Sequence, residues 1–291
     1  DKLLLHHRFE AGLDTQYLEL GELHDGWENP LCQLRGHFLG HWISAAAMEV
    51  YVTGDRELKA KADAIVEELG KCQQANGGEW CASIPEKYLT RVAEGEMIWA
   101  PQYTIHKTFM GLLDLYELTG NQQALDIAIG FSQWFHRWSG QFDEKEFNRI
   151  LDVETGGMLE VWSQLYGITK DSMHRDLIDR YYRYSLFEGL LDGNDVLTNM
   201  HANTTIPEVL GAARAYEVTG EKKWLKIVEA YWYRAVVTRG TFCTGGQTDG
   251  EIWTPEQRFA ARLGEKNQEH CTVYNMMRLA DFLFCQTGDV Q

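Results

Sequence analysis

The sequence predicts an all-α fold built from repeated helical hairpins. Three observations predict it: one short motif recurs five times, apolar residues at helical spacing precede each copy, and residues that favour a new helix start follow it. The motif consists of an aromatic residue, a Thr-Gly-like turn and a polar residue. Its copies lie at residues 51–55, 116–121, 166–171, 216–221 and 284–289.

Each copy of the motif marks the end of one helix and the start of the next. Glycine suits the left-handed position that ends many helices, and Asp, Asn or Glu then favours a new start. The third copy has Lys170 in place of glycine, so its cap must form without that residue. Counted at this position, the intervals between copies are 66, 50, 50 and 68 residues, which indicates repeated helical pairs.

Each repeat is expected to pair an apolar first helix with an amphipathic second helix, so that an outer ring wraps an inner one. First helices should begin near residues 37, 104, 157, 203 and 271. A further helix is expected over 3–20, and long loops over 77–101 and 240–267. An open superhelix would also satisfy the repeat. The 12% aromatic content favours a closed (α/α)6 barrel, of which this chain holds about five of six hairpins.

The composition narrows the range of partners. The 291 residues include 27 Lys+Arg against 43 Asp+Glu, and the net charge of −16 argues against nucleic acid and anionic membrane surfaces. A neutral sugar is compatible with this charge. No apolar run approaches the roughly 20 residues of a membrane span. Six cysteines are too sparse for a disulfide scaffold, so we expect a reduced, cytoplasmic protein.

Polar residues mark the start of every predicted first helix. Four of the five starts carry histidine, and the fifth carries a glutamate and two glycines. One histidine is more often structural, but in a ring of hairpins these starts share one mouth. Such a mouth suits a carbohydrate, because hydroxyls need donors and acceptors and sugar C–H faces stack on aromatic rings. Nearby aromatics, each of which could instead belong to the core, are Trp27, Trp80, Trp99, Tyr103 and Trp253.

The stretch 244–283 carries the strongest chemical signal. A glycine-rich loop ends in Glu251, and Glu269 and Cys271 follow where a helix begins. Unpaired N–H groups and the helix dipole favour a thiolate there, the form that binds metal or attacks carbon. On spacing alone, a structural role is the commoner one for both residues. Cys271 would then be a small buried residue, and Glu269 a charge at the start of a helix.

Six motifs, in order along nearly the whole chain, resemble the β-L-arabinofuranosidase families 127 and 146 of the glycoside hydrolases, the group known as domain of unknown function 1680. They are LRGHFLGH at 34–41, PQYTIHK at 101–107, ETGGM at 154–158, HANT at 201–204, GGQTDGE at 245–251 and EHCTVYN at 269–275. The resemblance implies an (α/α)6-barrel catalytic domain over 1–291, truncated at its C-terminal end. It also implies β-sandwich domains beyond residue 291.

The resemblance further implies a retaining exo-glycosidase with a cysteine nucleophile, a glutamate acid/base and bound zinc. Glu251 matches the acid/base, and Glu269 and Cys271 match two zinc ligands. The nucleophile and another cysteine ligand would form an adjacent Cys-Cys pair beyond Gln291, and the chain contains no such pair. The substrate would be an L-arabinofuranoside-containing glycan or glycoconjugate. We expect the sugar to contact His41, Tyr103, His106, His201 and Trp253, with Tyr103, His106, His201 and Glu251 facing one pocket.

Two other functions fit parts of the pattern. Another (α/α)6 sugar enzyme, such as an unsaturated glucuronyl hydrolase or a sugar epimerase, would need no zinc. An acidic uronate would require several arginines where the motifs hold only Arg35. A non-catalytic helical-repeat binding module is the third possibility. Since two of four zinc ligands lie in this chain, we expect it to bind zinc weakly and to lack hydrolase activity alone, with Cys243 as the next candidate ligand. We expect His37 to brace its loop.

Overall fold

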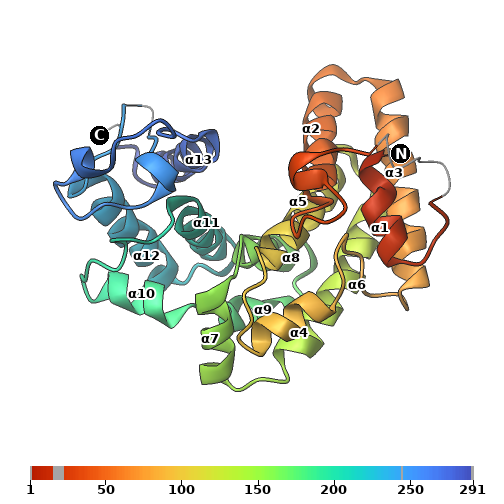
Figure 1. The fold of residues 1–291 in the computed structure, drawn as a ribbon, viewed down its shortest axis with the longest axis horizontal. Coiled ribbons are helices and arrows are strands. Elements are labelled where there is room, and N and C mark those ends of the chain that lie inside the picture. Colours follow the sequence, from red (N-terminus) through yellow and green to blue (C-terminus); the bar gives the residue numbers. More distant parts are fainter. Residues whose placement is uncertain (1, 16–22, 244, 290–291) are drawn as a thin grey trace. The chain divides into compact units, whose positions relative to one another are not determined.

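The computed structural model describes residues 2–15, 23–243 and 245–289, and it confirms an all-α fold. Within these ranges the regular elements are helices, and an isolated antiparallel bridge joins His201 and Ile252. The chain divides into two compact units, Asp1–Glu154 with Ser172–Asp176 and Thr155–Asp171 with Leu177–Gln291. Figure 1 shows the helices in chain order.

The first unit holds seven of the described α-helices. They are α1 Leu5–Glu10, α2 His37–Thr53, α3 Arg56–Ala75, α4 Lys87–Ala93, α5 Pro101–Thr119, α6 Gln122–Ser139 and α7 Glu144–Val153. Helix α9, Ser172–Arg180, has residues in both units. The second unit holds α8 Met158–Thr169, α10 Tyr184–Leu191, α11 Ala202–Thr219, α12 Lys222–Trp232 and α13 His270–Thr287.

The predicted repeat is confirmed at the level of its helices. The five helices that open the hairpins, α2, α5, α8, α11 and α13, begin within three residues of the expected positions. Each ends in a residue with left-handed backbone. Lys170 takes this conformation at φ 56°, so the third cap does form without glycine, while the glycine caps have φ values of 72° at Gly54, 75° at Gly120, 71° at Gly220 and 68° at Gly288.

Glycines allow the hairpin-opening helices to approach each other closely. A Cβ on Gly40 of α2 would collide with the carbonyl of Lys107 on α5, and one on Gly111 would lie 2.6 Å from the carbonyl oxygen of Gly40. In the second unit, a Cβ on Gly211 of α11 would lie 2.7 Å from the Cβ of Leu159 on α8. The two units therefore use the same device to pack neighbouring helices.

The burial of the helices agrees with the predicted apolar first helices. Helix α8 exposes no residue, and α5 and α11 expose one each, Glu117 and Glu217, at equivalent places in the repeat. Helices α2 and α13 differ, because each leaves large apolar side chains exposed. These are Phe38, Met48, Tyr51 and Val52 on α2, and Tyr274, Met277 and Phe284 on α13.

The second helices of the hairpins are amphipathic and pack one face on the first helices. On α6, the Phe131 ring stacks on Phe109 of α5 at a centroid distance of 4.6 Å, and Phe135 lies 6.1 Å from the same ring. On α12, Trp224 and Tyr231 are fully buried. Aromatic side chains thus fill the space between paired helices.

Two predicted segments differ from the structure. The helix expected over 3–20 is a short 3-10 turn, Lys2–Leu4, followed by α1, which ends at Glu10. Gly12 takes a φ of 66°, and its N–H and that of Leu13 bond back to the last carbonyls of α1, which closes the helix. Residues 16–20 lie outside the described residues. The segment 77–101 is not only a loop, because it contains α4.

The described residues of the long segment 240–267 form a loop, as predicted, with two 3-10 turns at Asp249–Glu251 and Phe259–Arg262. Among the described residues, no helix combines the length and the apolar character needed to cross a membrane.

Candidate active site

A short backbone pairing in the second unit brings Glu251 next to His201. The bridge between His201 and Ile252 is supported by a hydrogen bond from Trp253 N to Met200 O at 2.9 Å, and by one from Asn199 N to Trp253 O at 2.8 Å. The loop that carries Glu251 is thereby tied to the start of α11. As a result, Nε2 of His201 lies 3.7 Å from Oε2 of Glu251.

The backbone at Glu251 is strained. Gly250 has a φ of 73° and Glu251 itself a φ of 57°, a left-handed conformation that costs a non-glycine residue free energy. The hydroxyl of Thr248 donates to the carbonyl of Ile252 at 2.7 Å, which clamps the turn from inside. Strain of this kind is maintained where the surrounding structure fixes the direction of one side chain.

The surroundings of the Glu251 carboxyl favour its protonated form. Its side chain is only 18% exposed, and the buried Thr272 of α13 donates a hydrogen bond to it at 3.3 Å. Burial, and then the charge of Glu269, raise the pKa of Glu251 to about 7. Burial also lowers the pKa of His201. Around pH 7 the carboxyl of Glu251 is therefore present in both its protonated and its charged form, beside a histidine whose charged form is disfavoured by burial.

Glu269 and Cys271 form one local unit at the start of α13. The carboxylate of Glu269 accepts from the backbone N–H of Cys271 at 2.8 Å, which caps the helix, and from its thiol at 3.0 Å. A carboxylate oxygen and a sulfur side by side are suitable zinc donors. Within the described residues, no group of three or more His, Cys, Asp and Glu side chains is arranged to hold a metal ion. The pair fits as two ligands of a larger set.

Trp253 does not have the role expected for it. Its side chain is fully buried, and its indole N–H donates to the hydroxyl of Thr205 at 3.0 Å. The same hydroxyl lies 2.8 Å from that of Tyr231. The prediction that Trp253 contacts the sugar is therefore wrong in this structure, because the ring is packed into the core, where it anchors the loop that carries Glu251.

Gln247 is a polar residue of the same loop that the sequence analysis did not single out as a site residue. Its side chain is 1% exposed, and neither its amide nitrogen nor its amide oxygen has a hydrogen-bond partner within the described part of the chain. Its backbone carbonyl accepts from Gln268 N at 2.9 Å, so it lies beside the start of α13. A buried amide that has no hydrogen-bond partner within the protein usually bonds to a water molecule or a ligand. Thr244, the first residue of the predicted site stretch, lies outside the described residues.

In the first unit, carboxylates from other segments cap the helices that carry the predicted histidines. Glu28 accepts from the N–H groups of Gly36 and Phe38 at the start of α2, at 2.7 and 3.0 Å, and lies 2.8 Å from Nδ1 of His37. Glu154 accepts from the N–H groups of Gln102 and Tyr103 at the start of α5, at 2.8 and 3.0 Å. His37 thus braces its loop, in agreement with the prediction.

The structure brings His37, His41 and Tyr103 together. The His37 ring lies 5.9 Å from that of His41 and 6.0 Å from that of Tyr103. Burial, followed by Lys107 and His37, lowers the pKa of His41 to about 4, so this side chain is neutral near pH 7. His106 is buried, at 5% exposed.

The predicted site residues are divided between the two units. His41, Tyr103 and His106 belong to the first unit, whereas His201, Glu251 and the two predicted zinc ligands, Glu269 and Cys271, belong to the second. That Tyr103, His106, His201 and Glu251 face one pocket stays a prediction.

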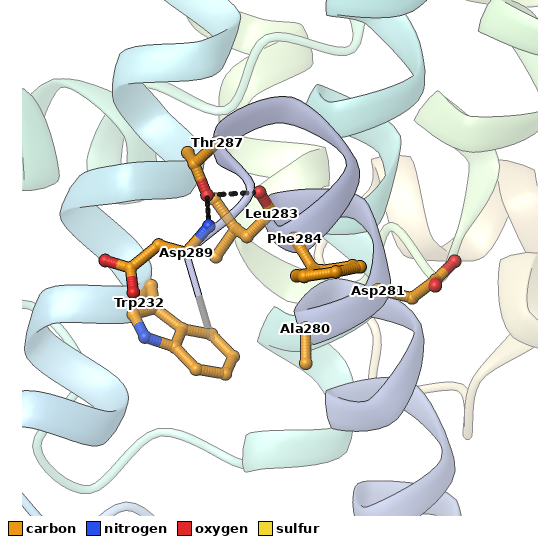
Figure 2. A pocket seen from close by; sticks show the side chains of 7 residues that line it. All are labelled: Trp232, Ala280, Asp281, Leu283, Phe284, Thr287 and Asp289. Atoms are coloured by element: carbon orange, nitrogen blue, oxygen red, sulfur yellow. Dashed lines mark hydrogen bonds between the residues drawn. The ribbon is translucent and has the colours of Figure 1, made fainter. Parts of the chain in front are cut away.

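Two surface pockets are lined by none of these residues. One has a volume of about 520 Å³ and is lined by Trp232 and by residues of α13 and its C-terminal cap (Figure 2). The other, of about 700 Å³, lies between α3 and α6. Neither contains a histidine or a cysteine, so neither offers the chemistry of the loop at Glu251.

Comparison with known proteins gives one family and several similar structures. A family model described as β-L-arabinofuranosidase, GH127 catalytic domain, matches residues 1–291. A GH127 β-L-arabinofuranosidase from Geobacillus stearothermophilus T6 is similar in structure, with a TM-score of 0.69 at 16% identity, covering 99% of this chain and 47% of its own. The GH127 β-arabinofuranosidase BT3674 gives 0.68 at 16% identity, with 99% and 46% covered.

These similarities show a shared fold at low sequence identity. The chain spans about half the length of both structures. No curated protein matches the sequence.

Proposed function

Because the chain belongs to the family of β-L-arabinofuranosidase GH127 catalytic domains, we propose that it supplies the acid/base of a retaining exo-glycosidase that releases β-L-arabinofuranose from glycans or glycoconjugates. The observation that carries this proposal is the largely buried carboxyl of Glu251, which lies 3.7 Å from His201 on a strained loop and whose pKa is raised by burial to about 7. A carboxyl with a raised pKa is what a general acid needs near neutral pH.

In the proposed reaction, the nucleophile forms a bond to the anomeric carbon while Glu251 donates its proton to the glycosidic oxygen, and the glycosidic bond breaks. Water then attacks the anomeric carbon and displaces the nucleophile, while the carboxylate of Glu251 takes a proton from that water and returns to its starting form. The hydroxyl of Thr272 donates a hydrogen bond to Oε2 of Glu251 and stabilises the charged form of this carboxylate. We propose a cysteine as the nucleophile on the opposite face of the sugar, and no cysteine of this chain is assigned to that role.

Zinc is proposed as the cofactor of the complete protein. Glu269 and Cys271 would hold it, since their donor atoms lie 3.0 Å apart at the start of α13. A bound zinc lowers the pKa of a coordinating thiol, so that the thiol is a thiolate at neutral pH. The Cys271 thiol donates to the carboxylate of Glu269, which orients the thiol without the metal.

The substrate is proposed to be a neutral sugar bound by His41, Tyr103, His106 and His201. Arg35 is the arginine that a uronate-binding enzyme would use, and it is 8% exposed and engaged with Glu10 at 3.0 Å and with Tyr88 at 3.3 Å. That observation favours a neutral sugar over an acidic one. The predicted cytoplasmic location and the predicted absence of nucleic-acid and membrane partners stay predictions.

The test is the dependence of the Glu251→Gln variant on the leaving group, measured in the complete protein. General acid catalysis contributes about 10²–10⁴-fold. We expect kcat/KM to fall by about this factor for an alkyl arabinofuranoside, whose leaving oxygen needs a proton. The nitrophenolate of a nitrophenyl arabinofuranoside leaves without that proton. The kcat/KM for this substrate should therefore fall far less.

Glu265→Gln is the matched control, because Glu265 is an exposed carboxylate of the same long loop. Equal losses for both leaving groups, or equal losses in both variants, would contradict the assignment of Glu251.

A further inference from the structure

Two exposed tryptophans in the first unit are placed edge to face. All ten tryptophans lie in the described residues, and the two with largely exposed side chains are Trp27, at 58%, and Trp99, at 53%. Their ring centroids lie 6.4 Å apart and their planes meet at 86°. The two residues are 72 positions apart in sequence, so their contact is made by the fold. Together the indoles form an aromatic corner on the surface.

Trp27 is held by its neighbours rather than by its own burial. It lies in the 3-10 turn Gly26–Glu28, where the Asp25 side chain accepts from the N–H of Gly26 at 2.9 Å. On its other side, Glu28 is fixed to the start of α2 by two backbone hydrogen bonds and by His37. The Trp27 ring contacts the ring of His37 at 6.1 Å.

Trp99 is fixed just before the start of α5. Its backbone N–H donates to the side chain of Gln33 at 2.7 Å. The next residue, Ala100, has a φ of 49°, and Pro101 then begins the helix. Both indoles are thus presented from anchored backbone, which reduces the entropy that a ligand must remove on binding.

The indole N–H groups of this pair are also unused. Neither Trp27 nor Trp99 has a hydrogen bond from its ring nitrogen to any residue that the structure describes, whereas buried Trp80 donates to Ile84 O at 3.2 Å and Trp253 to Thr205. The exposed pair therefore presents two partly open indole rings whose N–H groups can donate to a ligand.

We propose that Trp27 and Trp99 form a subsite that binds a sugar ring of the glycan by stacking on its C–H face. A sugar ring has one apolar face and a polar rim, which matches an aromatic corner with free N–H donors and with His37 beside it. The net charge of −16 favours a neutral ligand over an anionic one. This subsite rests on the proposed function, because it recognises a further sugar of the same substrate.

The subsite is tested by binding of a short arabinofuranose oligosaccharide to the complete protein carrying Glu251→Gln. Calorimetry gives the affinity, and thermal unfolding shows that each variant is folded. Trp27→Ala and Trp99→Ala should each weaken binding about 10-fold, the order of one aromatic contact, and Trp27→Phe should keep most of the affinity.

Leu31→Ala is the matched control, because Leu31 is 92% exposed and aliphatic, and it should bind like the parent. If both tryptophan variants bind the oligosaccharide as well as this control, the subsite is refuted, even where hydrolysis depends on Glu251. If the tryptophan effects appear but Glu251→Gln still hydrolyses, the subsite stands and the proposed acid/base role fails. A blue shift of tryptophan fluorescence with phosphatidylcholine vesicles, lost in Trp27→Ala, together with no response to the oligosaccharide, would assign the corner to lipid and overturn the proposal.

Discussion

Glu251 owes its chemistry to position more than to residue type. The chain holds 43 acidic residues, and most of them are solvated. Glu251 is instead half-buried in a turn with two successive left-handed residues, and Glu269 lies near enough to oppose its ionisation. Both effects favour the protonated form.

The pH dependence of activity follows from this raised pKa. A general acid works in its protonated form, which dominates below its pKa of about 7. For a substrate with a poor leaving group, we expect kcat/KM to fall about tenfold per pH unit above that value. The measurement is a pH profile of kcat/KM in the complete protein. Glu251→Gln should lose this alkaline limb, and a limb that persists in the variant would have to belong to another group.

The sequence identified Glu251 through the motif around it, but it could not show the partner of its carboxyl. His201 lies 50 residues earlier, and the two meet through a bridge that no local pattern encodes. Tryptophans show the same limit. Trp253 and Trp27 both lie in polar loops, yet one is fully buried and the other 58% exposed, because burial depends on distant residues such as Thr205 and Tyr231.

At the scale of the element, the helix ends were the most predictable feature. Each cap depends on residues adjacent in sequence, so five copies of one motif gave five helix ends and the starts that follow. The early end of α1 was missed because the turn at Gly12 was read as part of a periodic helix. Helix α4 was missed because it is short and lies in a segment without a repeat motif.

The Lys170 cap gives a pair of substitutions with opposite effects. Lys170 pays the cost of a left-handed backbone, so Lys170→Gly should stabilise the fold by about 0.5–1 kcal/mol, after loss of its contact with the Tyr166 ring. Gly120 occupies the equivalent turn with open space around it, so Gly120→Ala adds strain without a clash. It should destabilise by about 1 kcal/mol.

Both free energies of unfolding can be measured by urea denaturation. The two sites are equivalent left-handed caps, one formed by lysine and the other by glycine. If both substitutions changed the free energy of unfolding in the same direction, the left-handed cap would not control stability.

At the scale of the whole molecule, local patterns give the order of the hairpins but not how the ends of the array are completed. Helices α5, α8 and α11 have packed neighbours on nearly every side, while α2 and α13 leave apolar side chains exposed. The similar structures are about twice as long as this chain. The closed barrel and the further β-sandwich domains are long-range features, and they stay predictions.

Zinc binding is predicted for the complete protein rather than for this chain alone. This chain contributes a carboxylate and a thiol 3.0 Å apart, and the other two ligands are expected from cysteines outside these 291 residues. Most of the binding free energy of a zinc site comes from assembling the full set. We therefore expect the 291-residue chain, dialysed against metal-free buffer, to retain far less than one zinc per molecule by elemental analysis, and Cys271→Ser to change nothing in it.

In the complete protein, the same Cys271→Ser substitution should release zinc, because it removes a charged ligand from an assembled site. Cys285→Ser is the control, since Cys285 is an exposed cysteine at the far end of the same helix. One tightly held zinc in the 291-residue chain would contradict the partial site. The missing sulfur would then have to come from within these residues. Cys243, exposed and eight residues before Glu251, would be the first to substitute, and loss of the metal in Cys243→Ser would identify it as that ligand.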